Sequence, residues 1–292
     1  AITGSTSGDS ITGGAGADSI SSGDGNDTIV GFVGADTVDG GAGSADTIVL
    51  TATSSDLNTA GATDTRLAGV EAIDASGANA GVSLTLSGQT EGFSITGGVG
   101  ADSITGGSGA DSISAGDGAD VINGFVGTDT VDGGAGTDTI VLTGTSSDLN
   151  SASNAQIVNV EAVSASTASA GVELTLSNQS DGFTVTGSGF ADTITGSTGA
   201  DSISAGDGND VIKGFVGADT VDGGAGSADT IILTGTSSDL NSASNAQIVN
   251  VEAVSASGAA SGVTITLSSQ SEGFAITGST SGDSITGGAG AD

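Results

Sequence analysis

The chain has 292 residues and a formal net charge of −33, with 35 acidic residues against two basic ones, Arg66 and Lys213. It contains no His, Cys, Trp, Tyr, Met or Pro. Direct binding to nucleic acid or to an anionic membrane surface is excluded, because two basic residues could not neutralise phosphates. No apolar stretch is long enough to span a bilayer, and without Cys no disulfide can staple the fold.

The composition also argues against catalysis. Neither His nor Cys is available as a base or nucleophile, and the many Ser and Thr residues lack a base to activate them. Paired carboxylates could hydrolyse glycosides, but a catalytic pair should interrupt a sequence repeat rather than follow it. We therefore expect a chain that is not an enzyme and has no catalytic residue.

A nine-residue phrase, Gly-Gly-x-Gly-x-Asp-x-U-x with U aliphatic, organises the chain from its first residues and is clear at 13–21. Each copy predicts a six-residue turn followed by a three-residue strand whose central aliphatic side chain points inward. Two copies make one flattened coil, so each strand should stack on the second strand before it. The predicted strand centres of the first run are Ile11, Ile20, Ile29, Val38 and Ile48.

Aspartates recur at the sixth position of this phrase. Turn glycines leave backbone carbonyls uncovered, and Ca²⁺ prefers about six to eight oxygen ligands from carboxylates and carbonyls. Turns one coil apart are separated by about 4.8 Å, so a cation between them could take oxygens from both. The predicted calcium ligands are Asp9, Asp18, Asp27, Asp36, Asp46, Asp102, Asp111, Asp120, Asp129, Asp138, Asp192, Asp201, Asp210, Asp219, Asp229, Asp283 and Asp292.

The stacking predicts which aspartates share a cation, with about three cations in each repeat unit. Asp24, Asp117 and Asp207 could add outer-shell oxygens, and Phe190 in place of a glycine makes the Asp192 site doubtful. The alternative is that the aspartates only cap turns, since Asp and Gly are ordinary turn formers. The predicted pairs are Asp9–Asp27, Asp18–Asp36, Asp27–Asp46, Asp102–Asp120, Asp111–Asp129, Asp120–Asp138, Asp192–Asp210, Asp201–Asp219 and Asp210–Asp229.

These runs resemble the RTX β-roll of secreted bacterial proteins. The segments between them, such as residues 160–166, resemble the intervening segments of RTX-bearing surface-layer proteins and large adhesins. The resemblance implies an all-β, right-handed parallel β-solenoid. It also implies type I secretion and folding outside the cell.

The runs belong to three larger repeat units, and residues 275–292 are identical to residues 1–18. Because no Met is present, we expect the chain to be an excerpt of a longer repetitive protein or one subunit of a periodic fibre. The expected boundaries are 1–93 (β-roll 1–48, calcium-poor coils 49–93), 94–183 (β-roll 94–140, calcium-poor coils 141–183), 184–274 (β-roll 184–231, calcium-poor coils 232–274) and 275–292 as the start of the next period.

The calcium-poor segments should continue the solenoid with longer loops. In repeat 1 they predict strands near Val70, Val82 and Phe93, and a short helical turn near residues 54–58. This gives eight strands and four coils per repeat, a rise of roughly 19 Å per repeat and about 58 Å per 274 residues. Two interpretations stay open for Phe32, Phe125 and Phe215, namely a lateral contact between solenoids and rings folded over their own turns.

The first function hypothesis is a calcium-stabilised structural rod of an extracellular fibre, surface layer or adhesin stalk. Its partners would be calcium and further copies of itself, joined end to end, with lateral contacts left open. The alternatives are a polysaccharide- or ice-binding module, and the secretion and folding module of a larger RTX enzyme or toxin. Thr193 and Thr195 resemble an ice-binding ladder, although the flanking residues vary too much from coil to coil for a regular array.

Overall fold

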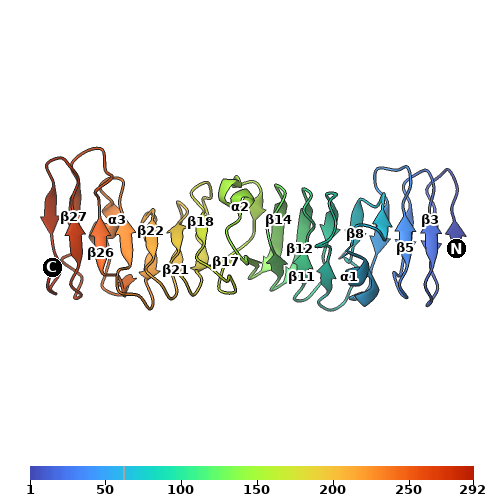
Figure 1. Ribbon diagram of the computed structural model, residues 1–292, viewed down its shortest axis with the longest axis horizontal. Coiled ribbons are helices and arrows are strands. Elements are labelled where there is room, and N and C mark those ends of the chain that lie inside the picture. Colours follow the sequence, from blue (N-terminus) through green and yellow to red (C-terminus); the bar gives the residue numbers. More distant parts are fainter. Residues whose placement is uncertain (62) are drawn as a thin grey trace. The chain divides into compact units, whose positions relative to one another are not determined.

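The computed structural model describes residues 1–61 and 63–292. They form two compact bodies: residues 1–141 with 155–160, and residues 142–154 with 161–292. In each body short parallel strands stack beside one another and are joined by turns, which is a parallel β-solenoid (Figure 1).

The first body contains three sets of parallel strands and one helix, α1 (Ser55–Gly61). The first set is β1 (Ile2–Thr3), β3 (Ser19–Ser21), β5 (Thr37–Asp39) and β7 (Leu67–Ala68). The second set is β2 (Ser10–Thr12), β4 (Thr28–Val30), β6 (Thr47–Val49), β8 (Ala72–Asp74), β10 (Ser94–Thr96), β12 (Ser112–Gly118), β14 (Thr130–Gly136) and β16 (Ile157–Val158). The third set is β9 (Ser83–Thr85), β11 (Ser103–Thr105), β13 (Val121–Asn123) and β15 (Thr139–Val141).

The second body repeats this plan with two helices, α2 (Ser147–Ser151) and α3 (Ser238–Ser242). One set is β17 (Ala162–Ser164), β19 (Thr184–Thr186), β21 (Ser202–Ser204), β23 (Thr220–Asp222) and β25 (Ile248–Val249). A second is β18 (Glu173–Thr175), β20 (Thr193–Thr195), β22 (Val211–Lys213), β24 (Thr230–Ile232), β26 (Ala253–Ser255) and β28 (Ala275–Thr277). The last is β27 (Thr264–Thr266) with β29 (Ser284–Thr286).

The strand register confirms the predicted coil. Ile11 lies beside Ile29, and Ile29 lies beside Ile48, so each strand pairs with the second strand before it. The central aliphatic residue of each triplet is buried, as in β4, where Ile29 is 1 % exposed. Burying one such side chain contributes roughly 1.5–3 kcal/mol. The strand centres form a thin column, and buried residues outside the strands, such as Leu50 and Phe93, add to the core.

The predicted count of eight strands per repeat is wrong. The described residues of repeat 1 hold nine strands, β1 to β9, because Leu67 and Ala68 form the additional strand β7 beside Val38 and Asp39. Repeats 2 and 3, described in full, also hold nine each, β10 to β18 and β19 to β27. An odd count makes successive repeats begin on opposite faces: β1 belongs to the odd-numbered set of its body, whereas β10 belongs to the even-numbered set.

The predicted helical turn is confirmed, and it covers an open strand edge. In repeat 1 the set β1–β7 ends and β9 starts a new one, so among the described residues β9 has no strand neighbour on the α1 side. Asn58 of α1 replaces that neighbour: its Nδ2 donates to the Ser83 carbonyl (3.0 Å) and its Oδ1 accepts the Thr85 N–H (2.9 Å). Asn241 of α3 does the same for β27.

Each helix is also anchored by a buried leucine and a serine cap. Leu57, Leu149 and Leu240 are at most 1 % exposed. The Ser237 hydroxyl accepts the Leu240 N–H, which satisfies a backbone donor at the start of α3. Among the described residues, no helix has the length and apolar character needed to cross a membrane.

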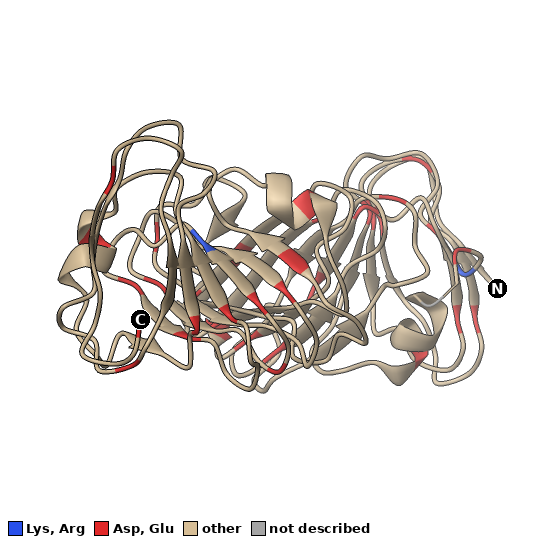
Figure 2. Ribbon diagram, turned by 60° about the vertical axis from the view of Figure 1, so that its left-hand side comes forward, with Lys and Arg blue, Asp and Glu red and all other residues tan. Residues whose placement is uncertain are grey.

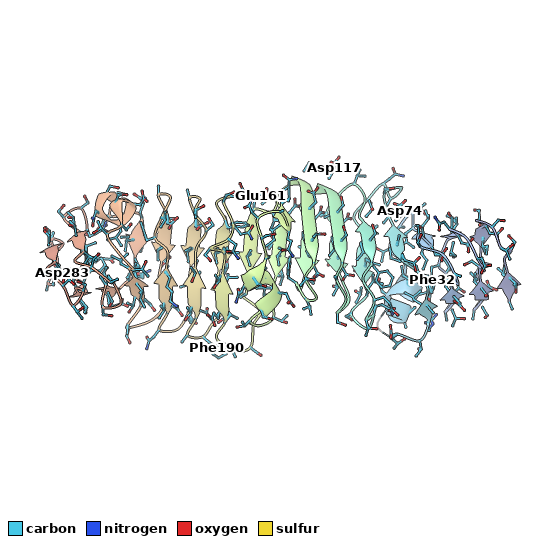
Figure 3. All side chains as sticks on the ribbon, turned by 90° about the horizontal axis from the view of Figure 1, so that it is seen from above. Phe32, Asp74, Asp117, Glu161, Phe190 and Asp283 are labelled. Atoms are coloured by element: carbon cyan, nitrogen blue, oxygen red, sulfur yellow. The ribbon has the colours of Figure 1, made fainter. Side chains whose placement is uncertain are left out.

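The three turn phenylalanines face inward, so of the two interpretations left open for their rings, the lateral contact is wrong. Phe32, Phe125 and Phe215 are at most 2 % exposed, in agreement with the other interpretation, in which the rings fold over the molecule. The Phe32 turn is tied to the loop of α1, because the Ser54 hydroxyl donates to the Phe32 carbonyl and Asp56 accepts the Gly34 N–H. By contrast, Phe190 projects at the edge of its turn and is 48 % exposed (Figure 3).

Candidate metal centre

The seventeen predicted aspartates all lie in the described part of the chain. They belong to the acidic residues that Figure 2 shows in red on both bodies. Thirteen of them are buried; Asp9, Asp18, Asp283 and Asp292 are not. Buried carboxylates are rare unless they are paired. Pairing within the chain cannot suffice, because 35 acidic residues face two basic ones, and Arg66 donates to the backbone carbonyl of Asp36.

The structure brings together every predicted aspartate pair. In each pair, the backbone N–H of the earlier aspartate donates to Oδ1 of the later one at 2.7–2.9 Å, which joins turns one coil apart. This repeated contact forms a ladder along each edge of the turns. The first two aspartates of later runs also reach back to the calcium-poor coil, as when Asp102 Oδ1 accepts the Val82 N–H and Asp111 Oδ1 accepts the Phe93 N–H.

The second carboxylate oxygen divides the turns into two kinds. In the first, second and fourth turns of a run, Oδ2 accepts a backbone N–H of its own turn, as in Gly14 to Asp18 (2.7 Å) and Val33 to Asp36 (3.1 Å). In the third and fifth turns Oδ2 is buried and, among the described residues, has no hydrogen-bond partner at Asp27, Asp46, Asp120, Asp210 and Asp229.

These partnerless oxygens are the test of whether the residues fit a cation. Asp27 and Asp46 occupy stacked turns and both present such an oxygen, and Asp210 and Asp229 repeat the arrangement. A buried acceptor without a donor costs about 1–3 kcal/mol, and more when it is charged. A hard cation that binds carboxylate and carbonyl oxygens would remove this cost, so the donor set fits Ca²⁺.

Burial dominates the electrostatics of the ladder. Desolvation raises the pKa of Asp46, Asp120, Asp210 and Asp229, partly offset by the backbone N–H that each carboxylate accepts. Desolvation likewise raises the pKa of Asp219 to about 6. The neighbouring carboxylates of the ladder add to several of these shifts, so the runs favour either protonation or a bound cation.

In several motif turns, the glycine at the first position makes room for the carboxylate and for the neighbouring coil. A Cβ on Gly97 would collide with the Ala115 carbonyl oxygen and crowd Asp102 Oδ2, and Gly187 stands in the same relation to Ala205 and Asp192. Within residues 1–61 and 63–292, no three metal-binding side chains converge on one point. Any cation would therefore be held by carboxylates from two turns together with backbone carbonyls.

Asp192 keeps its place in the ladder despite the exposed Phe190. Its backbone N–H donates to Asp210 Oδ1 (2.7 Å), and its own Oδ1 accepts the Val172 N–H (2.6 Å). This turn differs from the Asp102 turn at its second position, where Ser188 replaces a glycine. The Ser188 hydroxyl also donates to Asp192 Oδ1 (2.7 Å). A serine at the second turn position would therefore compete with a cation for the carboxylate oxygen. Ser197 makes the same contact with Asp201.

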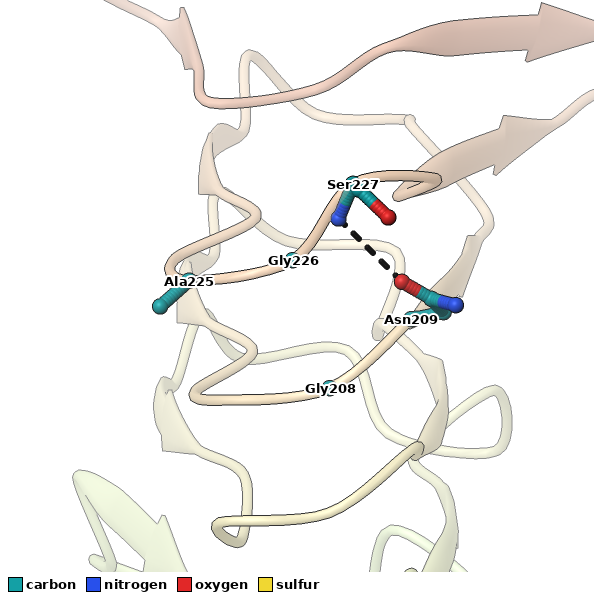
Figure 4. Close-up of a pocket in the computed structure, with 5 residues that line it drawn as sticks. All are labelled: Gly208, Asn209, Ala225, Gly226 and Ser227. Carbon is teal, nitrogen blue, oxygen red and sulfur yellow. Dashed lines mark hydrogen bonds between the residues drawn. The ribbon is translucent and has the colours of Figure 1, made fainter.

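The one-residue insertions Ser44 and Ser227 change the fifth turn of runs 1 and 3. The Ser227 N–H donates to Asn209 Oδ1 (3.2 Å) across a shallow hollow lined by Gly208, Ala225 and Gly226 (Figure 4). Ser44 and Asn26 make the equivalent contact. Run 2 has neither the insertion nor the asparagine, and there the backbone pairing of β12 with β14 continues through the turn to Gly118 and Gly136.

Sequence reasoning missed the side chains that end the ladders. Asp46 donates its N–H to Glu71 Oε2 (2.9 Å), and Asp229 donates to Glu252 Oε2 (2.8 Å). Both glutamates lie in the calcium-poor coils, outside the nonapeptide phrase. The only sequence signal was the repeated Val-Glu-Ala at residues 70–72, 160–162 and 251–253.

Comparison with known families agrees with this geometry. The RTX calcium-binding nonapeptide repeat matches residues 2–29, 12–44, 94–122, 105–140, 186–214, 195–228 and 275–292, which together cover a little more than half of the chain. No curated protein matches the chain. With its stacked nonapeptide turns and buried aspartate ladders, the chain belongs to the family of RTX calcium-binding nonapeptide repeat proteins.

Proposed function

We propose that the chain is a calcium-stabilised structural segment of a secreted bacterial fibre, surface layer or adhesin stalk. The observation that carries the proposal is the set of thirteen buried aspartates in a chain with two basic residues. Cations from solution would neutralise these carboxylates, and the binding free energy would become folding free energy.

The proposed ligands are the seventeen aspartates of the motif, with backbone carbonyls of the glycine-rich turns. The nine stacked pairs would hold about three cations in each of the repeat units 1–93, 94–183 and 184–274. When bound, Ca²⁺ would neutralise the carboxylates and cross-link one coil to the next. The aspartate N–H groups and the turn glycines set the spacing, and they do so through the hydrogen bonds of the ladder.

A structural role is supported by the tasks of the residues in each repeat. Each nonapeptide supplies one core aliphatic residue, one carboxylate and a turn, and each calcium-poor segment supplies a helix that covers a strand edge. Such repeats contact only their neighbours, so their number sets length without changing the local structure. An extracellular setting, in which calcium is abundant, is the setting the proposal requires, and end-to-end association of further repeats is part of it.

The proposal is tested by removing calcium. Far-UV circular dichroism and the hydrodynamic radius should show an expanded coil in chelator and a compact β-structure once calcium is restored. Magnesium at the same ionic strength serves as the control, because it prefers a smaller and more rigid octahedral site. A chain that keeps its full β-signal and its compact radius in excess chelator at low salt would contradict the proposal.

A further inference from the structure

In runs 1 and 3, the ladder of the first, third and fifth turns ends on a glutamate instead of an aspartate. Glu71 Oε2 accepts the Asp46 N–H (2.9 Å), as Asp46 Oδ1 accepts the Asp27 N–H (2.7 Å). In run 3, Glu252 bears the same relation to Asp229 (2.8 Å). The glutamates therefore occupy the next rung of the ladder, one coil beyond the last motif aspartate.

A shorter turn explains why a longer side chain stands there. Between β7, which ends at Ala68, and β8, which begins at Ala72, only residues 69–71 form the turn, against six residues in the motif. Glutamate is one methylene longer than aspartate, and from this short turn its Oε2 reaches the Asp46 N–H. Asp46 also accepts the N–H groups of Glu71 and Ala72 with its carbonyl, which fixes the short turn against the motif turn.

The short turn also presents a carbonyl where the motif presents one. A Cβ on Gly40 would collide with the Gly69 carbonyl oxygen, just as a Cβ on Gly4 would collide with the Ser22 carbonyl oxygen two coils earlier. Asn250 holds the corresponding place above Gly223. Gly69 and Asn250 adopt left-handed backbone conformations (φ +55° and +52°), which turn these carbonyls to the same position.

The partnerless oxygens of Asp46 and Asp229 point to a ligand. Both aspartates are 0 % exposed, and their Oδ2 atoms have no hydrogen-bond partner. Each also has the half-buried carboxylate of Glu71 or Glu252 beside it, and Lys213 and Arg66 are the only basic residues of the chain. Two adjacent carboxylates with a buried bare oxygen are stable together when a cation lies between them.

We propose that Asp46 with Glu71, and Asp229 with Glu252, each hold one additional Ca²⁺, with the carbonyls of Gly69 and Asn250 as further ligands. These run-closing sites lie outside the nonapeptide residues that match the family, which end at 44 and 228 in these runs. They rest on the proposed function, since they assume calcium-driven folding. They extend it, because they fasten the calcium-poor coils to the calcium-bound runs.

The test uses native mass spectrometry of the full chain to count bound Ca²⁺, with the double variant Glu71→Gln/Glu252→Gln. Glutamine keeps an oxygen that can accept the Asp46 or Asp229 N–H, so a purely structural hydrogen bond survives while the charge is lost. The matched control is Glu91→Gln/Glu173→Gln, which changes two exposed glutamates by the same charge.

At a calcium concentration that just saturates the wild type, we expect the double variant to bind two fewer Ca²⁺. Filling its last two Ca²⁺ sites should need a calcium concentration at least tenfold higher. The control should keep the full count. Far-UV circular dichroism in saturating calcium accompanies each count. A variant that folds and keeps the full count overturns the inference, and so does a loss that the control shares. A variant that fails to fold where the control folds supports it, because only the charge was removed.

These outcomes are separate from a failure of the proposed function. If the wild-type chain bound no calcium, or stayed folded in chelator, the proposed function would fail whatever the variants did. If the wild type folds with calcium and the double variant matches it in cation count and affinity, only the run-closing sites are rejected.

Discussion

Replacing Asp210 with asparagine should change stability in opposite directions with and without calcium. Asp210 accepts the Asp192 N–H through Oδ1 (2.7 Å), and its own N–H donates to Asp229 (2.7 Å), so it belongs to two stacked pairs. Its Oδ2 is buried without a hydrogen-bond partner, and desolvation raises its pKa. Asparagine keeps the Oδ1 acceptor and removes the buried charge.

The magnitudes follow from these contacts. A site filled at 100 times its dissociation constant contributes about 2.7 kcal/mol, so weakening both of the sites that share Asp210 should cost up to about 5 kcal/mol in calcium. In chelator the same substitution removes a buried carboxylate and leaves a less costly neutral amide. The metal-free chain should therefore gain about 1 kcal/mol at neutral pH.

Two folding assays measure the two states. Urea unfolding in excess calcium gives the first value. The concentration of trimethylamine oxide needed to fold the chain in chelator gives the second, because this osmolyte favours burial without supplying a cation. Asp181→Asn, an exposed position in a calcium-poor coil, is the control and should change neither. The reasoning would be refuted by a destabilisation of the same sign and size in both media, because the carboxylate would then serve only the turn.

Three further predictions address other parts of the molecule. Asp27→Ala should lower the calcium affinity of both of its aspartate pairs in a calcium titration. Asp64→Ala, outside the motif, should leave the titration unchanged. Equal effects of the two substitutions would contradict the pairing. The metal-free chain should be most stable near pH 4 and lose stability as the pH rises through about 6. The reason is that a raised folded-state pKa, such as that of Asp219, favours the protonated folded form. A chain in chelator whose circular dichroism is unchanged over that pH range would contradict this. Asn241→Ala should destabilise the calcium-bound chain by about 1–3 kcal/mol in urea, since it leaves the backbone of β27 without its two partners, while the exposed Ser257→Ala should have no effect.

The periodic part of the fold could be predicted because each nonapeptide by itself specifies a turn, a strand and a buried aliphatic residue. Ile11, Ile29 and Ile48 share a register because the turns between them have the same length, apart from the inserted Ser44, and nearly the same glycines. The pairing of Asp27 with Asp46 follows directly from that register, even though Ser44 is inserted between them. The insertion is absorbed in the turn, where Asn26 accepts its N–H, and the strands on either side are unaffected.

The parts that could not be predicted depend on contacts between distant segments. The two-residue strand at Leu67 and Ala68 has no alternating pattern of its own and exists because β5 offers an unpaired edge. Phe32 occupies an outward turn position by the motif, but the loop of α1 folds over it, through the Ser54 hydroxyl. Glu71 joins the ladder from the three-residue turn between β7 and β8, and that turn could not be expected without the strand at Leu67.

The odd number of strands has a consequence for any assembly in which the coils continue in register. Nine strands are four and a half coils, so at about 4.8 Å per coil each repeat adds about 22 Å rather than 19 Å, and the next repeat begins on the opposite face. Three repeats also make an odd count, so the 274-residue period would rise by about 65 Å and return with its faces exchanged. Identical sequence would then meet an identical face only after two periods, or about 130 Å.

Fibre diffraction or electron micrographs of calcium-bound assemblies should therefore show an axial spacing near 65 Å with a weaker one near 130 Å. A dominant 58 Å spacing would mean that the short strands at Leu67, Ile157 and Ile248 do not form in the assembly.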